Sequence, residues 1–183
     1  MDASDGSREQ ELVVLLDAAS ERIGTAPKAA VHTDATPLHL AFSCHLLDDE
    51  GRMLVTRRAL SKAAWPGVWT NACCGHPAPD EPMESAVRRR LQQELGVGAR
   101  QLELVLPEFA YRAVDAGGIV EHERCPVFLG RIEGELRPDA AEVLEWRWVE
   151  PEALLAGISA TPWAFSPWLV LQAEQLPVLA GAA

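Results

Sequence analysis

The sequence predicts an α/β fold in which helices and a mixed β-sheet pack as an α/β/α sandwich in a single domain. A chain of 183 residues has the usual length of one domain and is long enough to bury a sizeable core. Short apolar runs of strand length alternate along it with a segment of helical periodicity. Strands and helices in such a mixed order are typical of this fold class.

The first half of the chain contains the clearest strand signals. Residues 8–19 fit a strand or a short helix. Residues 39–47 form an apolar run that ends in the turn sequence Asp-Asp-Glu-Gly, and residues 52–57 fit the returning strand of a hairpin. Residues 68–74, with several aromatic and β-branched side chains, predict another strand.

At residues 82–95 the period of the apolar positions changes. Pro82 suits the first turn of a helix, and Gly96 suits its C-terminal cap. The apolar side chains between them recur every four residues, which predicts an amphipathic helix. They are Met83, Val87, Leu91 and Leu95.

The remaining elements alternate in the same way. Residues 102–113, 125–133 and 145–149 predict strands, and residues 151–155 and 167–176 predict helices.

Composition and charge exclude several classes of protein. The formal net charge of −11 argues against nucleic-acid binding, although an anionic small molecule could still bind where positive charge is concentrated. No apolar run approaches the roughly 20 residues needed to cross a bilayer, and the polar, acidic start does not resemble a signal peptide. The four cysteines include no CxxC pair, so we expect reduced thiols in the cytoplasm. We expect residues 1–7 to be disordered and residues 8–183 to form the domain.

Residues 65–77, with the sequence WPGVWTNACCGHP, place aromatic side chains, a thiol and an imidazole in one short passage. We expect Gly75 to give the backbone unusual freedom, so that Cys74 and His76 can be directed to one point. A cysteine alone is more often a small buried hydrophobic residue than a reactive one.

The passage opens a longer motif. Gly75, Glu81 and Arg89 are followed by Leu91, Glu94, Gly96 and Val97, and this pattern resembles the Nudix box, Gly-x5-Glu-x7-Arg-Glu-apolar-x-Glu-Glu-x-Gly-apolar. Two glutamate positions of that box hold Arg90 and Gln93 instead. In Nudix hydrolases the carboxylates gather divalent cations on a diphosphate, so the motif implies the scaffold without the hydrolytic metal cluster.

Other segments, in the same order and over about residues 10–175, resemble the type 1 isopentenyl diphosphate isomerases of that superfamily. They read HLAFS (39–43), LVTRRALSK (54–62), AWPGVWTN (64–71), CGHP (74–77), GIVEHE (118–123) and TPWAFSPW (161–168). The resemblance implies a shift of the double bond between isopentenyl and dimethylallyl diphosphate. This chemistry needs two proton-transfer groups, a dry pocket and an electron-rich group beside a carbocation-like species.

The resemblance also implies a role for individual residues. Cys74 and Glu123 match the proton-transfer groups on opposite faces of the substrate. Tyr111 matches the residue that supports Glu123, and Trp168 matches the aromatic side chain that faces the cation.

Metal and diphosphate sites follow from the same resemblance. Glu94 matches the residue that holds Mg²⁺ on the diphosphate. A protein-bound Mn²⁺, Zn²⁺ or Mg²⁺ would be held by His32, His39, His76, Glu121 and Glu123, and the diphosphate by Lys28, Arg58, Lys62 and Arg90.

Three alternatives remain open at this point. A Nudix pyrophosphohydrolase would release phosphate and tolerate the loss of Cys74. A non-catalytic protein with the same fold would have lost acid, base and ligand positions. An isomerase-like enzyme could act on another prenyl diphosphate. We expect a small-molecule isoprenoid diphosphate as partner, with no nucleic acid and no membrane; a monomer is compatible with the sequence, which does not fix the oligomeric state.

Overall fold

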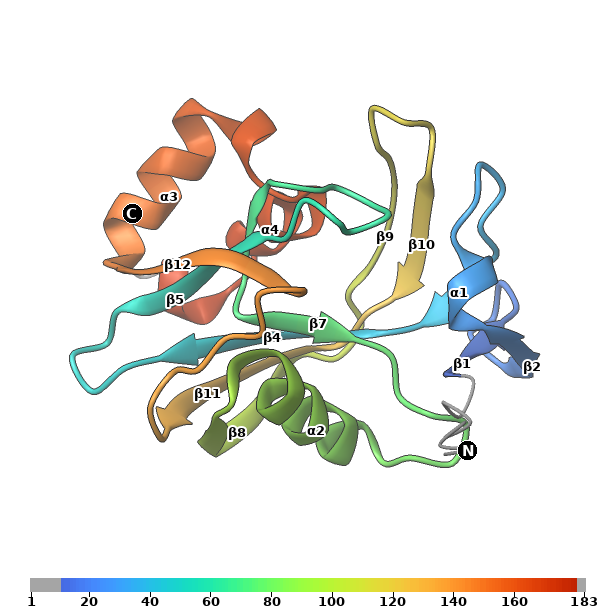
Figure 1. Cartoon of the computed structure of the whole chain (residues 1–183), viewed down its shortest axis with the longest axis horizontal. Coiled ribbons are helices and arrows are strands. Elements are labelled where there is room, and N and C mark those ends of the chain that lie inside the picture. Colours follow the sequence, from blue (N-terminus) through green and yellow to red (C-terminus); the bar gives the residue numbers. More distant parts are fainter. Residues whose placement is uncertain (1–10, 181–183) are drawn as a thin grey trace, which may run out of the picture.

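The computed structural model describes residues 11–180, so the expectation about residues 1–7 lies outside the described part. It contains two mixed β-sheets, and helices cover both faces of the larger one (Figure 1). The elements in chain order are β1 (Leu12–Leu16), β2 (Arg22–Pro27), α1 (Lys28–Val31), β3 (His39–Leu40), β4 (Phe42–Leu47), β5 (Met53–Arg58), β6 (Trp69–Thr70), β7 (Cys73–Gly75), α2 (Met83–Leu95), β8 (Gly98–Leu106), β9 (Ala110–Val114), β10 (Val120–Arg124), β11 (Val127–Glu133), β12 (Val143–Val149), α3 (Pro151–Ala160), the 3₁₀ helix η1 (Pro162–Ala164), α4 (Pro167–Ala173) and α5 (Pro177–Ala180).

The larger sheet has the order β12-β5-β4-β11-β8, with β6 paired to β5 and β7 to β4. Only the β4–β11 pair is parallel, so the predicted mixed sheet is confirmed. The predicted strand at 68–74 is divided into β6 and β7, and the one at 102–113 into β8 and β9. Residues 12–16 of the ambiguous first segment form a strand and not a helix.

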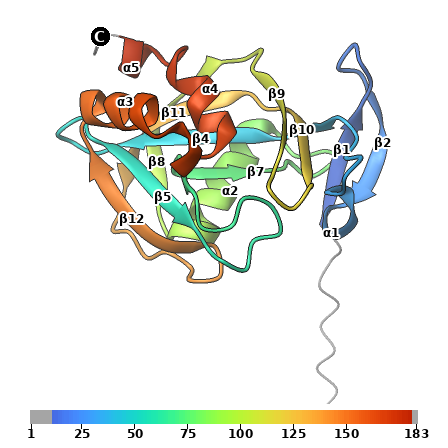
Figure 2. The same ribbon diagram turned by 90° about the horizontal axis from the view of Figure 1, so that it is seen from above.

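The smaller sheet has the order β2-β1-β3-β10-β9, and its β3–β10 pair is parallel. Figure 2 shows its β1–β2 hairpin at the end of the molecule away from α3 and α5. Neither β2 nor β10 follows from the sequence pattern. Strand β2 is mostly exposed, and β10 reads Val-Glu-His-Glu-Arg, so neither has the apolar alternation that marks a buried strand.

Strand β4 separates two apolar cores, because successive side chains of a strand point to opposite faces. Phe42, Cys44 and Leu46 pack with the buried face of α2. Ser43 and His45 lie on the other face, where both contact Gln172 of α4.

Two glycines at helix α2 have separate roles, one at its C-terminal end and one where it packs against β7. Gly96 ends the helix with a φ of 68°, and its N–H donates to the carbonyl of Gln92. Gly75 does not have a positive φ, so the expected backbone freedom is wrong. A Cβ at this position would instead lie 2.9 Å from Cγ of Arg90 and 3.0 Å from Cζ of Phe42. Gly75 is therefore needed for close packing.

Within residues 11–180, no helix is both long and apolar enough to cross a membrane.

Candidate active site

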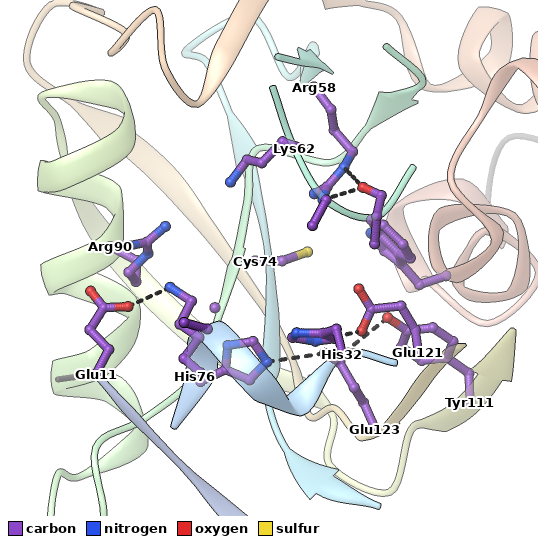
Figure 3. Close-up of a pocket in the computed structure, with 16 residues that line it drawn as sticks. Glu11, His32, Arg58, Lys62, Cys74, His76, Arg90, Tyr111, Glu121 and Glu123 are labelled. Carbon is purple, nitrogen blue, oxygen red and sulfur yellow. Dashed lines mark hydrogen bonds and ion pairs between the residues drawn. The ribbon is translucent and has the colours of Figure 1, made fainter. Parts of the chain in front are cut away.

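A cavity of about 1040 Å³ lies where the two sheets meet. It is lined by every residue that the sequence predicts for the site except His39 and Glu94, which are 0% and 7% exposed. Figure 3 shows Cys74 near its centre, with Arg58, Lys62 and Arg90 on one side and His76, Glu121, Glu123 and Tyr111 on the other. The lining residues among those predicted are Lys28, His32, Arg58, Lys62, Cys74, His76, Arg90, Tyr111, Glu121, Glu123 and Trp168.

Three imidazoles and a carboxylate converge on one point of this cavity. The ligand atoms of His32, His39, His76 and Glu123 all lie within 4.8 Å of one another. They come from separate elements, because His32 follows α1, His39 starts β3, His76 follows β7 and Glu123 lies in β10. The parallel pairing of β3 and β10 places Glu123 opposite His39.

The geometry of this cluster fits a divalent cation. Nδ1 of His39 is 2.9 Å from the carbonyl of Pro37, so Nδ1 donates there and Nε2 faces the cluster. That Nε2 atom lies 3.2 Å from Nε2 of His76 and 3.4 Å from Oε1 of Glu123. Mixed nitrogen and oxygen ligands in this number suit Zn²⁺ or Mn²⁺ better than a purely oxygen-seeking ion.

Glu121 lies at the edge of the same cluster. Its Oε2 atom is 3.1 Å from Nε2 of His32. The angles at this contact do not fit a hydrogen bond, and among the described residues neither buried atom has another partner. Buried polar atoms without partners are rare in proteins, and a shared cation would satisfy both. Glu121 therefore lies beside the cluster, outside the set of four residues whose ligand atoms lie within 4.8 Å of one another.

The protonation states follow from burial and from neighbouring charges. Burial lowers the pKa of His76 to about 4, which keeps its imidazole neutral. Burial alone would raise the pKa of Glu123, but the imidazoles of His39 and His76 hold it well below its usual range. Burial and the charge of Glu123 raise the pKa of Glu121.

Tyr111 joins this cluster to the apolar part of the cavity. Antiparallel pairing of β9 and β10 places it opposite Glu123, and its hydroxyl donates to Oε2 of Glu123 at 2.9 Å. Its ring centroid lies 5.8 Å from that of Trp168. Burial raises the pKa of Tyr111 well above its usual value, so the phenol stays protonated.

Cys74, on β7, lies on the wall formed by the larger sheet, and Trp168, on α4, lies next to Tyr111. Burial raises the pKa of Cys74 to about 11, although contacts from Ser43 and Asn71 lower it in part. The indole N–H of Trp168 donates to Oγ1 of Thr70 at 2.9 Å and to Oδ1 of Asn71 at 3.0 Å. The cavity therefore has a protonated thiol on one wall and an ionised carboxylate on the other.

The four predicted diphosphate-binding cations lie around the same cavity, each with an internal partner. Lys28 pairs with Glu11 at 2.5 Å, and Arg58 donates to the carbonyl of Ala64 while its guanidinium lies 5.3 Å from the ring centroid of Trp168. Lys62 and Arg90 each pair with a glutamate.

Two glutamates hold Lys62 and Arg90. Glu142 is hydrogen-bonded to Lys62 and lies 3.6 Å from Arg90, and Glu94 is hydrogen-bonded to Arg90. Burial raises the pKa of Glu94, while Arg90 acts in the opposite direction. Sequence reasoning did not find Glu142 or Glu11. They are linked to the site only because the folded chain places them beside its basic residues.

Comparisons with known proteins agree with this fold and site. The model of the NUDIX domain family matches residues 37–169. A protein of Agromyces mediolanus named isopentenyl-diphosphate Delta-isomerase is 63% identical over 173 residues, which is 94% of this chain and 84% of the relative. A protein of Paenarthrobacter aurescens with the same name is 57% identical over 178 residues, covering 94% and 97%.

Solved structures show the same fold at lower identity. The crystal structure of a MutT NUDIX hydrolase from Burkholderia pseudomallei has a TM-score of 0.60 and 25% identity, and covers 76% of this chain and 98% of that one. A protein of Deinococcus radiodurans has a TM-score of 0.62 and 22% identity, with coverage of 82% and 90%.

Proposed function

The chain belongs to the isopentenyl-diphosphate Delta-isomerases within the NUDIX domain family, and we propose that Cys74 and Glu123 carry out its two proton transfers. It is an isomerase that interconverts isopentenyl and dimethylallyl diphosphate. The observation that carries the mechanistic proposal is the cavity with a protonated Cys74 on one wall and an ionised Glu123, bonded to Tyr111, on the other.

The proposed reaction consists of one proton gained and one proton lost by the substrate. One group protonates the terminal carbon of the alkene, which leaves a tertiary carbocation-like species. The other group removes a proton from the carbon next to the cationic centre, on the side of the diphosphate. The double bond moves by one position, and no net charge is added or lost. Because the reaction is reversible, each group donates in one direction and accepts in the other.

Tyr111 and Trp168 assist these transfers. The hydroxyl of Tyr111 holds Oε2 of Glu123 and presents a phenol at the same wall, where it can pass a proton to or from the carboxylate. Trp168 offers its aromatic face to the developing positive charge, and a cation–π contact is stronger in a site without water. The buried positions of both rings, with exposed fractions of 8% and 3%, support this assignment.

We propose that Lys28, Arg58, Lys62 and Arg90 bind the diphosphate. Their charges are concentrated at one end of the cavity of a protein whose net charge is −11. Arg90 stands where a Nudix hydrolase carries a glutamate, and a fixed positive charge there favours binding of an intact diphosphate over its hydrolysis.

Two metal sites belong to the proposal. We propose that His32, His39, His76, Glu121 and Glu123 hold a divalent ion, Zn²⁺, Mn²⁺ or Mg²⁺, and that Glu94 holds Mg²⁺ with the diphosphate. A cation in the first site would fix the orientation of Glu123 and adjust its pKa, and Mg²⁺ would neutralise charge on the phosphate oxygens.

We also propose a cytoplasmic location, which the four free thiols support.

The test is product analysis by nuclear magnetic resonance with isopentenyl diphosphate and Mg²⁺ in D₂O, on protein of verified metal content. The proposal predicts dimethylallyl diphosphate that carries solvent deuterium in its new methyl group. Release of phosphate or diphosphate without this product would support the hydrolase alternative. Turnover of only a longer prenyl diphosphate would identify a different substrate.

A further inference from the structure

Four buried polar side chains lie behind Cys74, and the proposed mechanism uses none of them. Ser43, His45, Asn71 and Gln172 have exposed fractions of 0–1%, and none lines the cavity. Ser43 and His45 are on β4, Asn71 precedes β7, and Gln172 is on α4. Polar groups at such depth are costly unless all of them are hydrogen-bonded, so their arrangement requires an explanation.

The four side chains form one continuous path through the sulfur atom. Nε2 of His45 is 2.8 Å from Oε1 of Gln172, and Nε2 of Gln172 is 3.0 Å from Oγ of Ser43. Oγ of Ser43 is 3.4 Å from Sγ of Cys74, which is in turn 3.3 Å from Oδ1 of Asn71.

Asn71 determines the direction of every hydrogen bond on this path. Its side-chain N–H₂ donates to the carbonyls of Cys44 at 2.9 Å and Cys73 at 2.8 Å, so its Oδ1 atom must face the sulfur. A carbonyl oxygen can only accept. The single proton of the Cys74 thiol therefore points to Asn71, which leaves the sulfur free to accept a hydrogen bond from the Ser43 hydroxyl.

The remaining assignments follow from that step. A Ser43 oxygen whose proton is used on sulfur accepts from the side-chain amide nitrogen of Gln172. The amide oxygen of Gln172 then faces His45, which must carry its proton on Nε2. Burial lowers the pKa of His45 to about 4, so the ring is neutral at physiological pH and keeps this tautomer.

We propose that Ser43, Gln172 and His45 are positioning residues that hold a hydroxyl donor on the sulfur of Cys74 during proton transfer. This proposal rests on the proposed role of Cys74. When Cys74 gives its proton to a substrate carbon, the S–H bond breaks and its electron pair stays on sulfur, where the Ser43 hydroxyl is already aimed. In the reverse step the sulfur takes the proton back. A donor fixed before charge develops costs no reorganisation in the transition state.

Cys125 is the one competing acceptor for this hydroxyl among the contacts of Ser43. Its sulfur lies 3.5 Å from Oγ of Ser43, but Cys125 is 1% exposed and does not line the cavity. A hydroxyl turned to Cys125 would have no effect on the reaction. The test must therefore report on Cys74 itself as well as on the rate.

The first measurement is steady-state kinetics of Ser43→Ala. We expect kcat to fall about a hundredfold, the lower end of the range for lost donors to a developing charge, with KM for isopentenyl diphosphate within about twofold of the wild-type value. Gln172→Met keeps the volume and removes the link to Ser43, and we expect a smaller loss of about threefold to tenfold in kcat. The matched control is Cys44→Ala, which also removes one heavy atom from β4 but on the opposite face; its kcat should stay within about twofold.

The second measurement is the S–H stretching band of Cys74, isolated as the infrared difference between each protein and its Cys74→Ala counterpart. Loss of the Ser43 donor should weaken the thiol's own bond to Asn71 and move the band to higher frequency, whereas Cys44→Ala should leave it in place. An unchanged kcat in Ser43→Ala, or a reduced kcat with an unmoved band, would overturn the inference. Activity that survives Cys74→Ser would instead overturn the proposed function, so the two failures are distinguishable.

Discussion

The two walls of the cavity satisfy their polar groups in different ways. On the wall from the smaller sheet, His32 and Glu121 face each other as buried atoms without hydrogen-bond partners. On the wall from the larger sheet, Asn71 and Ser43 contact Cys74 and also bond to further side chains or carbonyls behind it. The first arrangement leaves two buried polar atoms that an ion could satisfy, whereas the contacts of Asn71 and Ser43 are made within the polypeptide. In the proposed mechanism, a single active site would thus combine one proton-transfer group beside a metal-binding cluster with another that folding alone positions.

Removal of the proposed metal should produce the largest effect, because the ion would hold several ligands of the first wall, including Glu123, in place at once. We expect treatment with a strong chelator to abolish turnover and to lower the melting temperature by several degrees, since lost metal-binding energy is lost folding energy. Calorimetry and metal analysis before and after dialysis measure both. His39→Ala should reproduce the effect without chelator. A chelated protein with unchanged activity and stability would show that the imidazole cluster holds no functional ion.

Loss of a diphosphate-binding cation should have the next largest effect. Lys62→Met removes a charge that lines the cavity but leaves both walls intact, so we expect KM to rise about tenfold to a hundredfold with kcat within about threefold. Arg57→Met is a suitable control, because Arg57 is paired with Glu145 and does not line the cavity. A change in kcat alone would contradict the assignment of Lys62 to diphosphate binding.

The second wall should show a characteristic pH dependence of stability through His45. Burial lowers its pKa from 6.5 to about 4, so the unfolded chain binds a proton in this range that the folded protein does not. The free energy of unfolding should therefore be constant above pH 7 and fall by roughly 3 kcal/mol as pH decreases from about 6.5 to 4. Denaturation by urea at several pH values, compared with His45→Gln, isolates this contribution. Parallel curves for the two proteins would contradict it.

The packing between α2 and β7 should give the smallest effect. Gly75→Ala places a methyl group against Arg90 and Phe42, and we expect a loss of about 1–3 kcal/mol in the free energy of unfolding. Urea denaturation measures it, and Gly98→Ala, whose nearest contact is a flexible Glu133 side chain, provides the control. Equal stability of Gly75→Ala and wild type would mean that α2 moves away without cost.

The sequence predicted much of the fold because local patterns carry it. Apolar residues that recur every four positions predicted α2, and the turn after residue 47 predicted the β4–β5 hairpin. Strand β10 was not predicted, because its charged residues do not form the apolar pattern that indicates a buried strand. Glu121 and Glu123 are nevertheless only 7% and 6% exposed and face the site. A charged strand of this kind is buried only because the site around it binds those charges.

The candidate site was predicted through resemblance to a family, and the surrounding network was not. Cys74, His76 and Glu123 lie in recognisable motifs. Ser43 is the last residue of the segment HLAFS, but the resemblance assigns it no role, and Gln172 lies 129 positions further along the chain. Only the packing of α4 on β4 brings them together, and no local pattern reports such a contact.

The proposed pair of proton-transfer groups is tested most directly by a comparison of Cys74→Ser and Glu123→Gln, one variant for each wall, in the same isomerisation assay. Each should lower kcat by a thousandfold or more, at about the upper end of the range for lost acid–base groups, while circular dichroism shows an unchanged fold. Metal analysis should find the ion retained in Cys74→Ser. Near-normal turnover in either variant would contradict the claim that the two walls each supply one proton-transfer group.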